Sequence, residues 1–275
     1  MLFLKLGGSL ITEKDKPSTV RANTLVRVSQ EIAAARAAHP GLRLLLGHGS
    51  GSFGHVPAQQ HGTRAGVASP AQWRGFVEVW QQAAALDRLV MDALQAAGLP
   101  ALAFPPLAAV LAAGGAIVAW DLLPIRRALD AGLLPVVYGD VAFDSLRGGT
   151  ILSTEDLFVY LAAHLKPTRI LLAGDEEGVL ANYPADPQLI PEITSSTANQ
   201  VWSSVTRQSR GGTPQAGASS APADVTGGMA GKVQAMLALV EHLPGCEVRI
   251  FSGLVPENIM KAISGAPLGT LLKRD

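Results

Sequence analysis

The sequence predicts an α/β fold in which parallel strands are joined by crossover helices. Short apolar runs alternate with amphipathic stretches along almost the whole chain, which is the pattern of such a sheet. The runs are mostly apolar on both faces, as expected for strands that helices cover on both sides. Eight runs are strand candidates: Leu2 to Leu6, Leu42 to Leu46, Ala101 to Phe104, Ala116 to Ala119, Leu134 to Tyr138, Ile170 to Ala173, Val248 to Phe251 and Leu268 to Leu272.

Two of the amphipathic stretches carry apolar side chains at i, i+3, i+4 and i+7, which predicts helices with one buried stripe. The stripes are Trp73, Phe76, Val77 and Trp80 in the first helix and Val233, Met236, Leu237 and Val240 in the second. Residues 99–120 hold no charge and could span a bilayer by length, but Pro and Gly interrupt them repeatedly. We therefore predict a buried strand, a short helix and another buried strand there.

Composition favours a soluble globular protein with a large core. The chain has 275 residues, 48% of them hydrophobic and 16% charged, and 22 basic residues balance 22 acidic ones. No cluster of Lys and Arg is present, which argues against a nucleic-acid or acidic-membrane partner. The single cysteine, Cys246, is predicted to be a core residue in a protein of the reducing cytoplasm. The N-terminal apolar run is short and contains Lys5, so we do not expect a signal peptide.

Four glycine-rich turns follow the predicted strands or open a helix. In a parallel sheet such turns gather at the carboxyl edge, where glycines let backbone N–H groups approach a phosphate. Lys232 lies in the first turn of a predicted helix, where a cation opposes the helix dipole unless an anion is bound. The turns are KLGGS (Lys5 to Ser9), GHGSGSFGH (Gly47 to His55), YGDV (Tyr138 to Val141, followed by Asp144) and DVTGGMAGK (Asp224 to Lys232).

Other phosphate and cofactor motifs fit less well. Gly49, Gly51 and Gly54 match the dinucleotide fingerprint, but they follow the second strand and the first acid after them is Glu78. The last turn is no Walker A loop, because the lysine is followed by Val233. The sequence contains no HExxH, cysteine pair or GxSxG motif. An NAD(P)-binding oxidoreductase and a non-catalytic nucleotide sensor remain as alternatives.

Taken in order, KLGGSLITEK, GHGSGSFGH, YGDV, STED, LLAGDEEGVL with YPADP, and DVTGGMAGK resemble the amino-acid kinase superfamily. Within it they are most similar to the isopentenyl phosphate kinases, with fosfomycin kinases as the alternative. The resemblance implies an open αβα sandwich with a mainly parallel central sheet, formed by one domain over residues 1–275. It also implies an acceptor lobe at about 1–165, an ATP lobe at about 166–275, ATP and Mg²⁺ as cofactors, and a cytoplasmic homodimer that phosphorylates isopentenyl phosphate in isoprenoid biosynthesis.

The resemblance also assigns roles by matching motif. Residues implied to contact ATP or the transferring phosphoryl group are Lys5, Gly7, Gly8, Ser9, Lys14, Gly51, Asp175 (at the nucleoside end), Gly178, Gly228 and Lys232. Residues implied to contact the acceptor are Ser50, His55 and Gly139. His55, Lys5, Lys14 and Lys232 are the implied catalytic residues, and no protein side chain is implied as a metal ligand. Where relatives have SGD this chain has Ser153, Thr154 and Glu155, so either Glu155 or Asp156 organises the lysines.

The chemistry of a phosphate acceptor agrees with these residues. Its second ionisation falls at about pH 6, so it is a nucleophile without a general base. The enzyme must instead supply positive charge and alignment. His55 favours a phosphate or phosphonate acceptor, and an isopentenyl tail requires an apolar wall. Phe76 and its three stripe partners are candidates for that wall or for the core. Residues 203–223 are predicted to be a flexible surface loop, either an active-site lid or a tolerated insertion.

Overall fold

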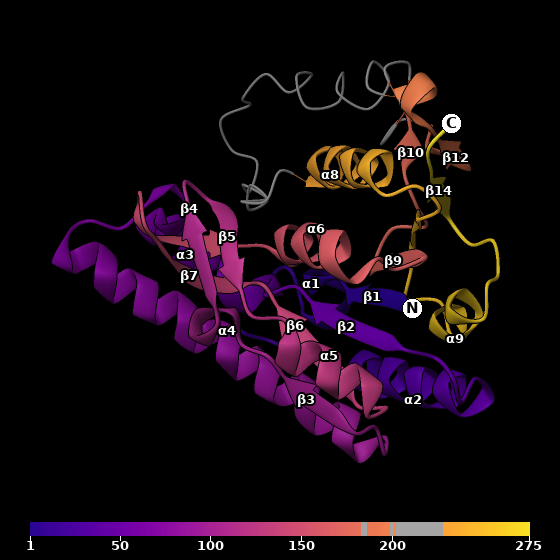
Figure 1. The fold of residues 1–275 in the computed structure, drawn as a ribbon, viewed down its shortest axis with the longest axis horizontal. Helices are drawn as coiled ribbons and strands as arrows, with labels where there is room; N and C mark the ends of the chain where they lie inside the picture. Colours follow the sequence, from indigo (N-terminus) through magenta and orange to yellow (C-terminus); the bar gives the residue numbers. More distant parts are fainter. Residues whose placement is uncertain (183–185, 199–200, 202–227) are drawn as a thin grey trace.

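An eight-stranded sheet forms the centre of the computed structural model, which describes residues 1–182, 186–198, 201 and 228–275 (Figure 1). The strand order is β12-β14-β13-β9-β1-β2-β6-β3. Neighbouring strands from β13 to β3 are parallel, and only β14 pairs antiparallel with β13, which confirms the predicted mainly parallel sheet. The strands are β1 (Leu2–Leu6), β2 (Leu44–His48), β3 (Ala101–Ala103), β6 (Leu134–Tyr138), β9 (Arg169–Gly174), β12 (Glu192–Ile193), β13 (Glu247–Ser252) and β14 (Thr270–Leu272).

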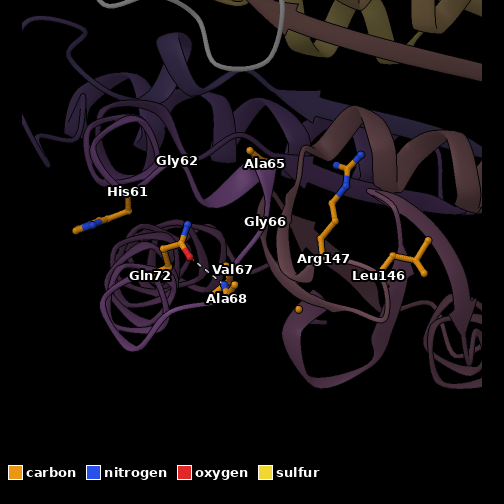
Figure 2. A pocket seen from close by; sticks show the side chains of 10 residues that line it. His61, Gly62, Ala65, Gly66, Val67, Ala68, Gln72, Leu146 and Arg147 are labelled. Atoms are coloured by element: carbon orange, nitrogen blue, oxygen red, sulfur yellow. Dashed lines mark hydrogen bonds between the residues drawn. The ribbon is translucent and has the colours of Figure 1, made fainter.

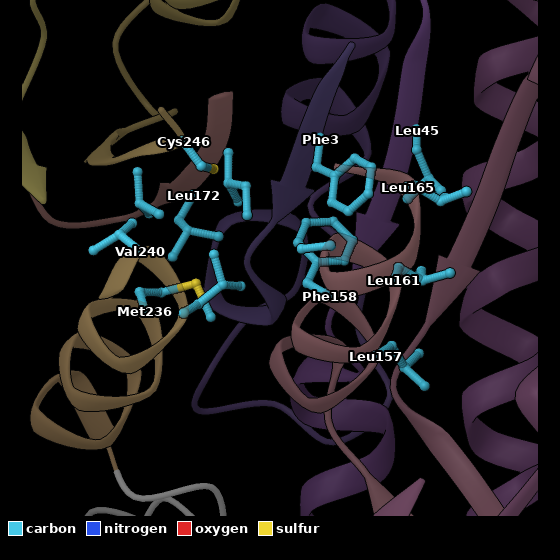
Figure 3. Packing of buried hydrophobic residues seen from close by; sticks show 14 of the residues in the cluster. Phe3, Leu45, Leu157, Phe158, Leu161, Leu165, Leu172, Met236, Val240 and Cys246 are labelled. Atoms are coloured by element: carbon cyan, nitrogen blue, oxygen red, sulfur yellow. The ribbon is translucent and has the colours of Figure 1, made fainter. Parts of the chain in front are cut away.

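Helices cover both faces of this sheet. Successive side chains of a strand point to opposite faces, so β1 contributes to two cores. Phe3 packs against Phe158 of α6, with ring centroids 5.1 Å apart, in the core shown in Figure 3. Leu2 and Leu4 enter the core on the other face. The first core receives α5 (Leu123–Asp130), α6 (Thr154–Leu165) and α8 (Gly228–His242), and the second receives α1 (Gly8–Ile11), α2 (Ala22–Ala38), α4 (Pro70–Ala96) and α9 (Asn258–Ile263).

A second sheet, with the order β5-β4-β7-β8, lies beside α3 (Gly51–His61) and the first half of α4 (Figure 1). Its strands are β4 (Val110–Ala113), β5 (Ala116–Trp120), β7 (Asp140–Asp144) and β8 (Gly148–Leu152). The YGDV segment was predicted as a turn, yet a strand begins at Asp140. Backbone N–H groups of both hairpin turns donate to the carboxylate of Asp144, which stabilises this arrangement.

The prediction for residues 99–120 is only partly right. The first strand and the short helix exist as β3 and the 3-10 turn η2 (Pro106–Ala108). The rest forms the β4–β5 hairpin, whose turn residues Gly114 and Gly115 have positive φ. Four of the five residues of β5 are exposed or half-buried, because it is the edge strand of the second sheet. In the described residues no helix is both long and apolar enough to cross a membrane.

The two predicted stripes have different outcomes. In α8 the predicted residues are all buried, as expected. In α4 the buried face runs through Phe76, Val79 and Ala83, while Val77 and Trp80 are 47% and 37% exposed. The predicted stripe is therefore half right, because Phe76 is buried and Trp73 half-buried in this 27-residue helix. Cys246 is a buried free thiol, as predicted, and burial raises its pKa to about 12. The predicted loop at 203–223 lies outside the described residues.

Candidate active site

The turns that follow β1 and β2 touch backbone to backbone. A Cβ atom on Gly8 would lie 2.5 Å from the nitrogen of Gly51, and one on Gly49 would lie 2.9 Å from the nitrogen of Gly8. Thr12 links the two turns, since its hydroxyl donates to the Gly8 carbonyl (2.8 Å) and accepts from the Ser52 N–H (3.0 Å). Only glycine fits at these contacts. The structure therefore brings together the first two predicted phosphate turns.

Lys5 forms a buried ion pair with Glu155 beside these turns. The Lys5 Nζ atom lies 2.8 Å from Glu155 Oε1, and the two side chains are 8% and 10% exposed. Burial alone would raise the pKa of Glu155, but the charges of Lys5 and Lys232 and the hydrogen bond from Lys5 hold it below its ordinary value. All three side chains line one small pocket. Glu155 is therefore the acid that faces both lysines.

Asp156, the other candidate for that role, faces elsewhere. Its carboxylate forms a capping box with Ser153 at the start of α6 and pairs with Arg64, whose Nη2 lies 3.1 Å from Oδ2. Adjacent residues in the first turn of a helix point about 100° apart, so the two acids cannot share a target. The choice that the sequence left open is settled by the orientation of α6.

Asp175 gathers Lys14 and Ser9 at the end of β9. Its carboxylate lies 2.6 Å from Lys14 Nζ and accepts a 2.8 Å hydrogen bond from the Ser9 hydroxyl. Burial would raise the pKa of Asp175, but these two hydrogen bonds and the lysine charge lower it. The residues that line the same pocket are Lys5, Gly7, Ser9, Glu155, Leu172, Ala173, Gly174, Asp175, Glu176, Met229, Lys232 and Ile250.

Three other predicted ATP-side glycines are also placed. The N–H of Gly7 donates to the carbonyl of Ala173, so this N–H group already has a backbone partner. Gly178 packs tightly, because a Cβ there would lie 2.6 Å from Leu189 Cδ1. Gly228 is the first residue of α8, and residues 224–227 of the same motif lie outside the described part of the chain.

The predicted acceptor residues lie next to this pocket at the ends of β2 and β6. Ser50 precedes α3 as its N-cap residue. The N–H of Gly139 donates to the His48 carbonyl (3.2 Å), which also accepts from the hydroxyl of Thr154 (2.6 Å), the neighbour of Glu155. The backbone of His55 lies in α3, and its side chain lies outside the described part of the structure. The role of His55 stays a prediction.

Phe76 belongs to a small apolar cluster between α3, α4 and the β7–β8 hairpin. Its ring contacts those of Trp73 and Phe143, at centroid distances of 5.2 and 5.6 Å. Val77 and Trp80 are not members, so half of the predicted wall faces solvent. The buried members are Ala58, Val67, Phe76, Val79 and Val141, with Trp73, Leu107 and Ile151 packed against them.

A wide hollow of about 670 Å³ opens beside this apolar cluster and shares Val67 with it (Figure 2). It lies between the C-terminal end of α3 and the hairpin that carries Arg147. No predicted site residue lines it. The lining residues are His61, Gly62, Ala65, Gly66, Val67, Ala68, Gln72, Leu146, Arg147 and Gly148.

A buried polar cluster at the ends of β2 and β6 was missed by the sequence analysis. His48 Nε2 lies 3.1 Å from Asp87 Oδ1, and the imidazole stacks on Tyr138. Asp140 is 1% exposed, and its Oδ2 atom has no hydrogen-bond partner among the described residues. Burial raises its pKa to about 7, with a further contribution from the Asp87 charge, against the N–H groups of Val141 and Leu107. The sequence held one sign of this cluster, because Asp87 continues the buried face of α4.

Comparisons with known proteins point to one family. A model of the amino acid kinase family matches residues 1–252. The isopentenyl phosphate kinase of Methanothermobacter thermautotrophicus is 35% identical, over 96% of each chain. That of Haloferax volcanii is 33% identical, over 99% of this chain and 98% of the relative. A solved structure of isopentenyl phosphate kinase superposes with a TM-score of 0.81 at 30% identity, covering 99% of this chain and 100% of the other.

Proposed function

The chain belongs to the amino acid kinase family, and on that premise we propose that it transfers the terminal phosphoryl group of ATP to isopentenyl phosphate, which yields isopentenyl diphosphate and ADP. The observation that carries the proposal is the buried arrangement of Lys5 and Glu155 beside Lys232 at the edge where the glycine turns meet. Two phosphoryl groups can be neutralised there. The full-length similarity to several isopentenyl phosphate kinases names the acceptor.

Lys5 and Lys232 are proposed to bind the transferring phosphoryl group from two sides. Transfer between two phosphates needs little covalent help from a protein, so positioning and electrostatic stabilisation supply most of the rate. Glu155 holds the ammonium group of Lys5 in place before substrate arrives, and its carboxylate also attracts the charge of Lys232. Lys14 is held by Asp175 on the more open side of the pocket, and we propose that it moves from this carboxylate to the ATP phosphates.

Magnesium is proposed to arrive with ATP. The described residues contain no group of three His, Cys, Asp or Glu side chains that could hold a metal ion. Two of the three acids of the pocket, Glu155 and Asp175, are engaged by lysines, and Mg²⁺ is commonly held by substrate phosphates and water with few protein ligands. When bound, it would neutralise phosphate charge. Lys5, Lys14 and Lys232 are the cations that this chain itself contributes.

The acceptor is proposed to lie with its phosphate near Ser50, His55 and Gly139 and its tail toward the apolar cluster of Phe76. An isopentenyl tail offers only carbon, and its burial contributes about 0.8 kcal/mol per CH₂. The apolar cluster supplies a matching surface next to the Gly139 turn, since Val141 follows two residues later on β7. A phosphate dianion needs no base, which agrees with a pocket rich in lysine.

Incubation of the purified protein with ATP, Mg²⁺ and isopentenyl phosphate tests the proposal. We expect ADP and isopentenyl diphosphate in equal amounts, measured by coupled ADP detection and by mass spectrometry of the product. The controls are parallel reactions with fosfomycin and binding titrations with NAD⁺ and NADP⁺. Turnover of fosfomycin without turnover of isopentenyl phosphate would show that the acceptor is a phosphonate. Tight NAD(P) binding without ATP binding would show that the protein is not a kinase but an NAD(P)-binding protein.

We further propose that the protein is a cytoplasmic homodimer. The family resemblance implies the dimer, and the single buried thiol of Cys246 suits a reducing compartment. Light scattering after size exclusion measures the mass, for which a value near twice the 28.6 kDa of one chain is expected. Fractionation of cells measures the location.

A further inference from the structure

We propose that His48 and Asp87 position the acceptor turn: the buried imidazole of His48, which faces Asp87 with one ring nitrogen and the Gly49 carbonyl with the other, fastens Gly49 to helix α4. This inference rests on the proposed function, because it assigns a positioning role for the same reaction. Neither residue belongs to the predicted site. The inference follows from the partners of the two ring nitrogens, from the groups around the imidazole, and from the elements that the pair joins.

Both ring nitrogens of His48 face oxygen atoms. Nε2 lies 3.1 Å from Asp87 Oδ1, and Nδ1 lies 3.2 Å from the carbonyl oxygen of Gly49. One imidazole thus contacts the backbone of the turn and a side chain of α4 at the same time.

The surroundings of the imidazole fix its position. The groups around it are Asp87 from α4, Tyr138 from β6 and Asp140 from β7. The Tyr138 ring is stacked on the imidazole, with centroids 5.3 Å apart and planes 12° apart. His48 itself is fully buried, so water does not compete for its two hydrogen bonds.

The pair joins the turn to the helix that carries the apolar wall. Gly49 immediately precedes Ser50, a predicted acceptor residue, so a displaced Gly49 would move the acceptor side of the site. Asp87 lies on the buried face of α4, about three turns from Phe76. One rigid helix thus locates the phosphate turn at one point and the tail cluster at another. Loosening the pair should weaken acceptor binding more than ATP binding.

Helix α4 offers a matched control. Glu78 accepts from His61 Nε2 at 2.9 Å, which makes a second histidine–carboxylate pair on the same helix. Glu78 is half exposed, and it lies outside the pocket and the apolar cluster. Glu78→Gln therefore removes a carboxylate of the same kind from the same helix without touching the turn. It should leave acceptor and ATP kinetics unchanged.

The test combines nitrogen NMR with kinetics on wild type, Asp87→Asn and Glu78→Gln. In ¹⁵N-labelled protein we expect the signals of the His48 ring nitrogens, assigned by their loss in His48→Gln, to shift in Asp87→Asn and to stay in place in Glu78→Gln. The KM for isopentenyl phosphate should rise about 10-fold, as for a lost hydrogen bond to a charged group, while the KM for ATP stays constant.

Two results would overturn the inference. One is a set of His48 ring-nitrogen signals that is the same in wild type and in a folded Asp87→Asn protein, since the two residues are then not in contact. The other is an equal rise of both KM values in a folded Asp87→Asn protein, since that indicates a general structural role. A wild-type protein that does not phosphorylate isopentenyl phosphate would refute the proposed function instead, and the spectra would still decide whether His48 and Asp87 are in contact.

Discussion

Glu155 and Asp140 are two buried carboxylates at the same edge of the sheet, and they differ in the charges around them. Glu155 lies against Lys5 and Lys232, which hold its pKa below the ordinary value despite burial. Asp140 has Asp87 as its charged neighbour, and burial raises its pKa to about 7. Burial opposes ionisation at both sites. The difference shows that cations decide which buried acid stays charged, and that this charge coincides with the proposed phosphate site.

The largest expected effect comes from removing the charge of Glu155. Glu155→Gln leaves Lys5 buried without its acid, so we expect the free energy of unfolding to fall by about 3 to 5 kcal/mol. We also expect kcat to fall about 100- to 1,000-fold, because the lysines no longer meet the phosphoryl group preorganised. Urea denaturation and steady-state kinetics measure the two effects. Glu177→Gln, an exposed acid two residues beyond Asp175, is the control. A folded Glu155→Gln protein with wild-type kcat would contradict the role.

Asp140→Asn should raise the free energy of unfolding, whereas Glu155→Gln should lower it. The folded pKa of about 7 lies above the ordinary 3.8, so wild-type stability from this group is fully present below about pH 4 and is lost as pH rises to about 7. An amide cannot ionise. We expect Asp140→Asn to exceed wild type by up to about 4 kcal/mol near pH 8 and to match it near pH 4. Denaturant titrations across this pH range measure the difference, and a gain that does not vary with pH would refute it.

A smaller effect is expected at Asp156, and this effect distinguishes its role from that of its neighbour Glu155. Asp156→Asn weakens the capping box of α6 and the pair with Arg64, so stability should fall by about 1 kcal/mol. The value of kcat should stay near that of wild type, because the side chain does not face the lysines. Thermal unfolding and kinetics at saturating substrates check this. A collapse of kcat with normal stability would move the organising role from Glu155 to Asp156.

The smallest effect on stability is expected at the open side of the pocket. Lys14 is 55% exposed, so its pair with Asp175 should contribute at most about 1 kcal/mol. Asp175→Asn should therefore unfold almost like wild type, with a difference that shrinks further at high salt. The KM for ATP should still change, because Asp175 places both Lys14 and Ser9. Denaturation and ATP kinetics at low and high salt test this, and a large salt-independent loss of stability would disagree.

The central sheet could be predicted because its strands are apolar on both faces, and few other structures bury such runs. Of the second sheet, one strand was predicted, since Ala116 to Ala119 lies in β5, but β4, β7 and β8 were not. Strand β7 begins and ends with aspartate, and β8 begins with two glycines, which are residues that usually mark turns. These strands depend on contacts that the sequence does not display, such as the carboxylate of Asp144 at both hairpin turns. The local preference was overridden by tertiary structure.

The candidate site was predictable to the extent that it follows from topology. Turns after parallel strands meet at one edge, and Gly8 and Gly51 do meet there. The orientation of side chains was not predictable, since the choice between Glu155 and Asp156 depends on how α6 is rotated. The partnership of His48 with Asp87 joins residues 39 positions apart on a strand and a helix. Nothing in either segment alone points to the other.

The position of β1 has a consequence for synthesis. Its two neighbours are β2 and β9, and β9 begins at Arg169, far along the chain. At about 5 to 20 residues per second, one edge of this strand, which is apolar apart from Lys5, waits roughly 10 to 30 seconds for its partner to leave the ribosome. An open apolar edge is a template for pairing with other chains. The nascent protein should therefore depend on chaperones during that interval more than the finished enzyme does.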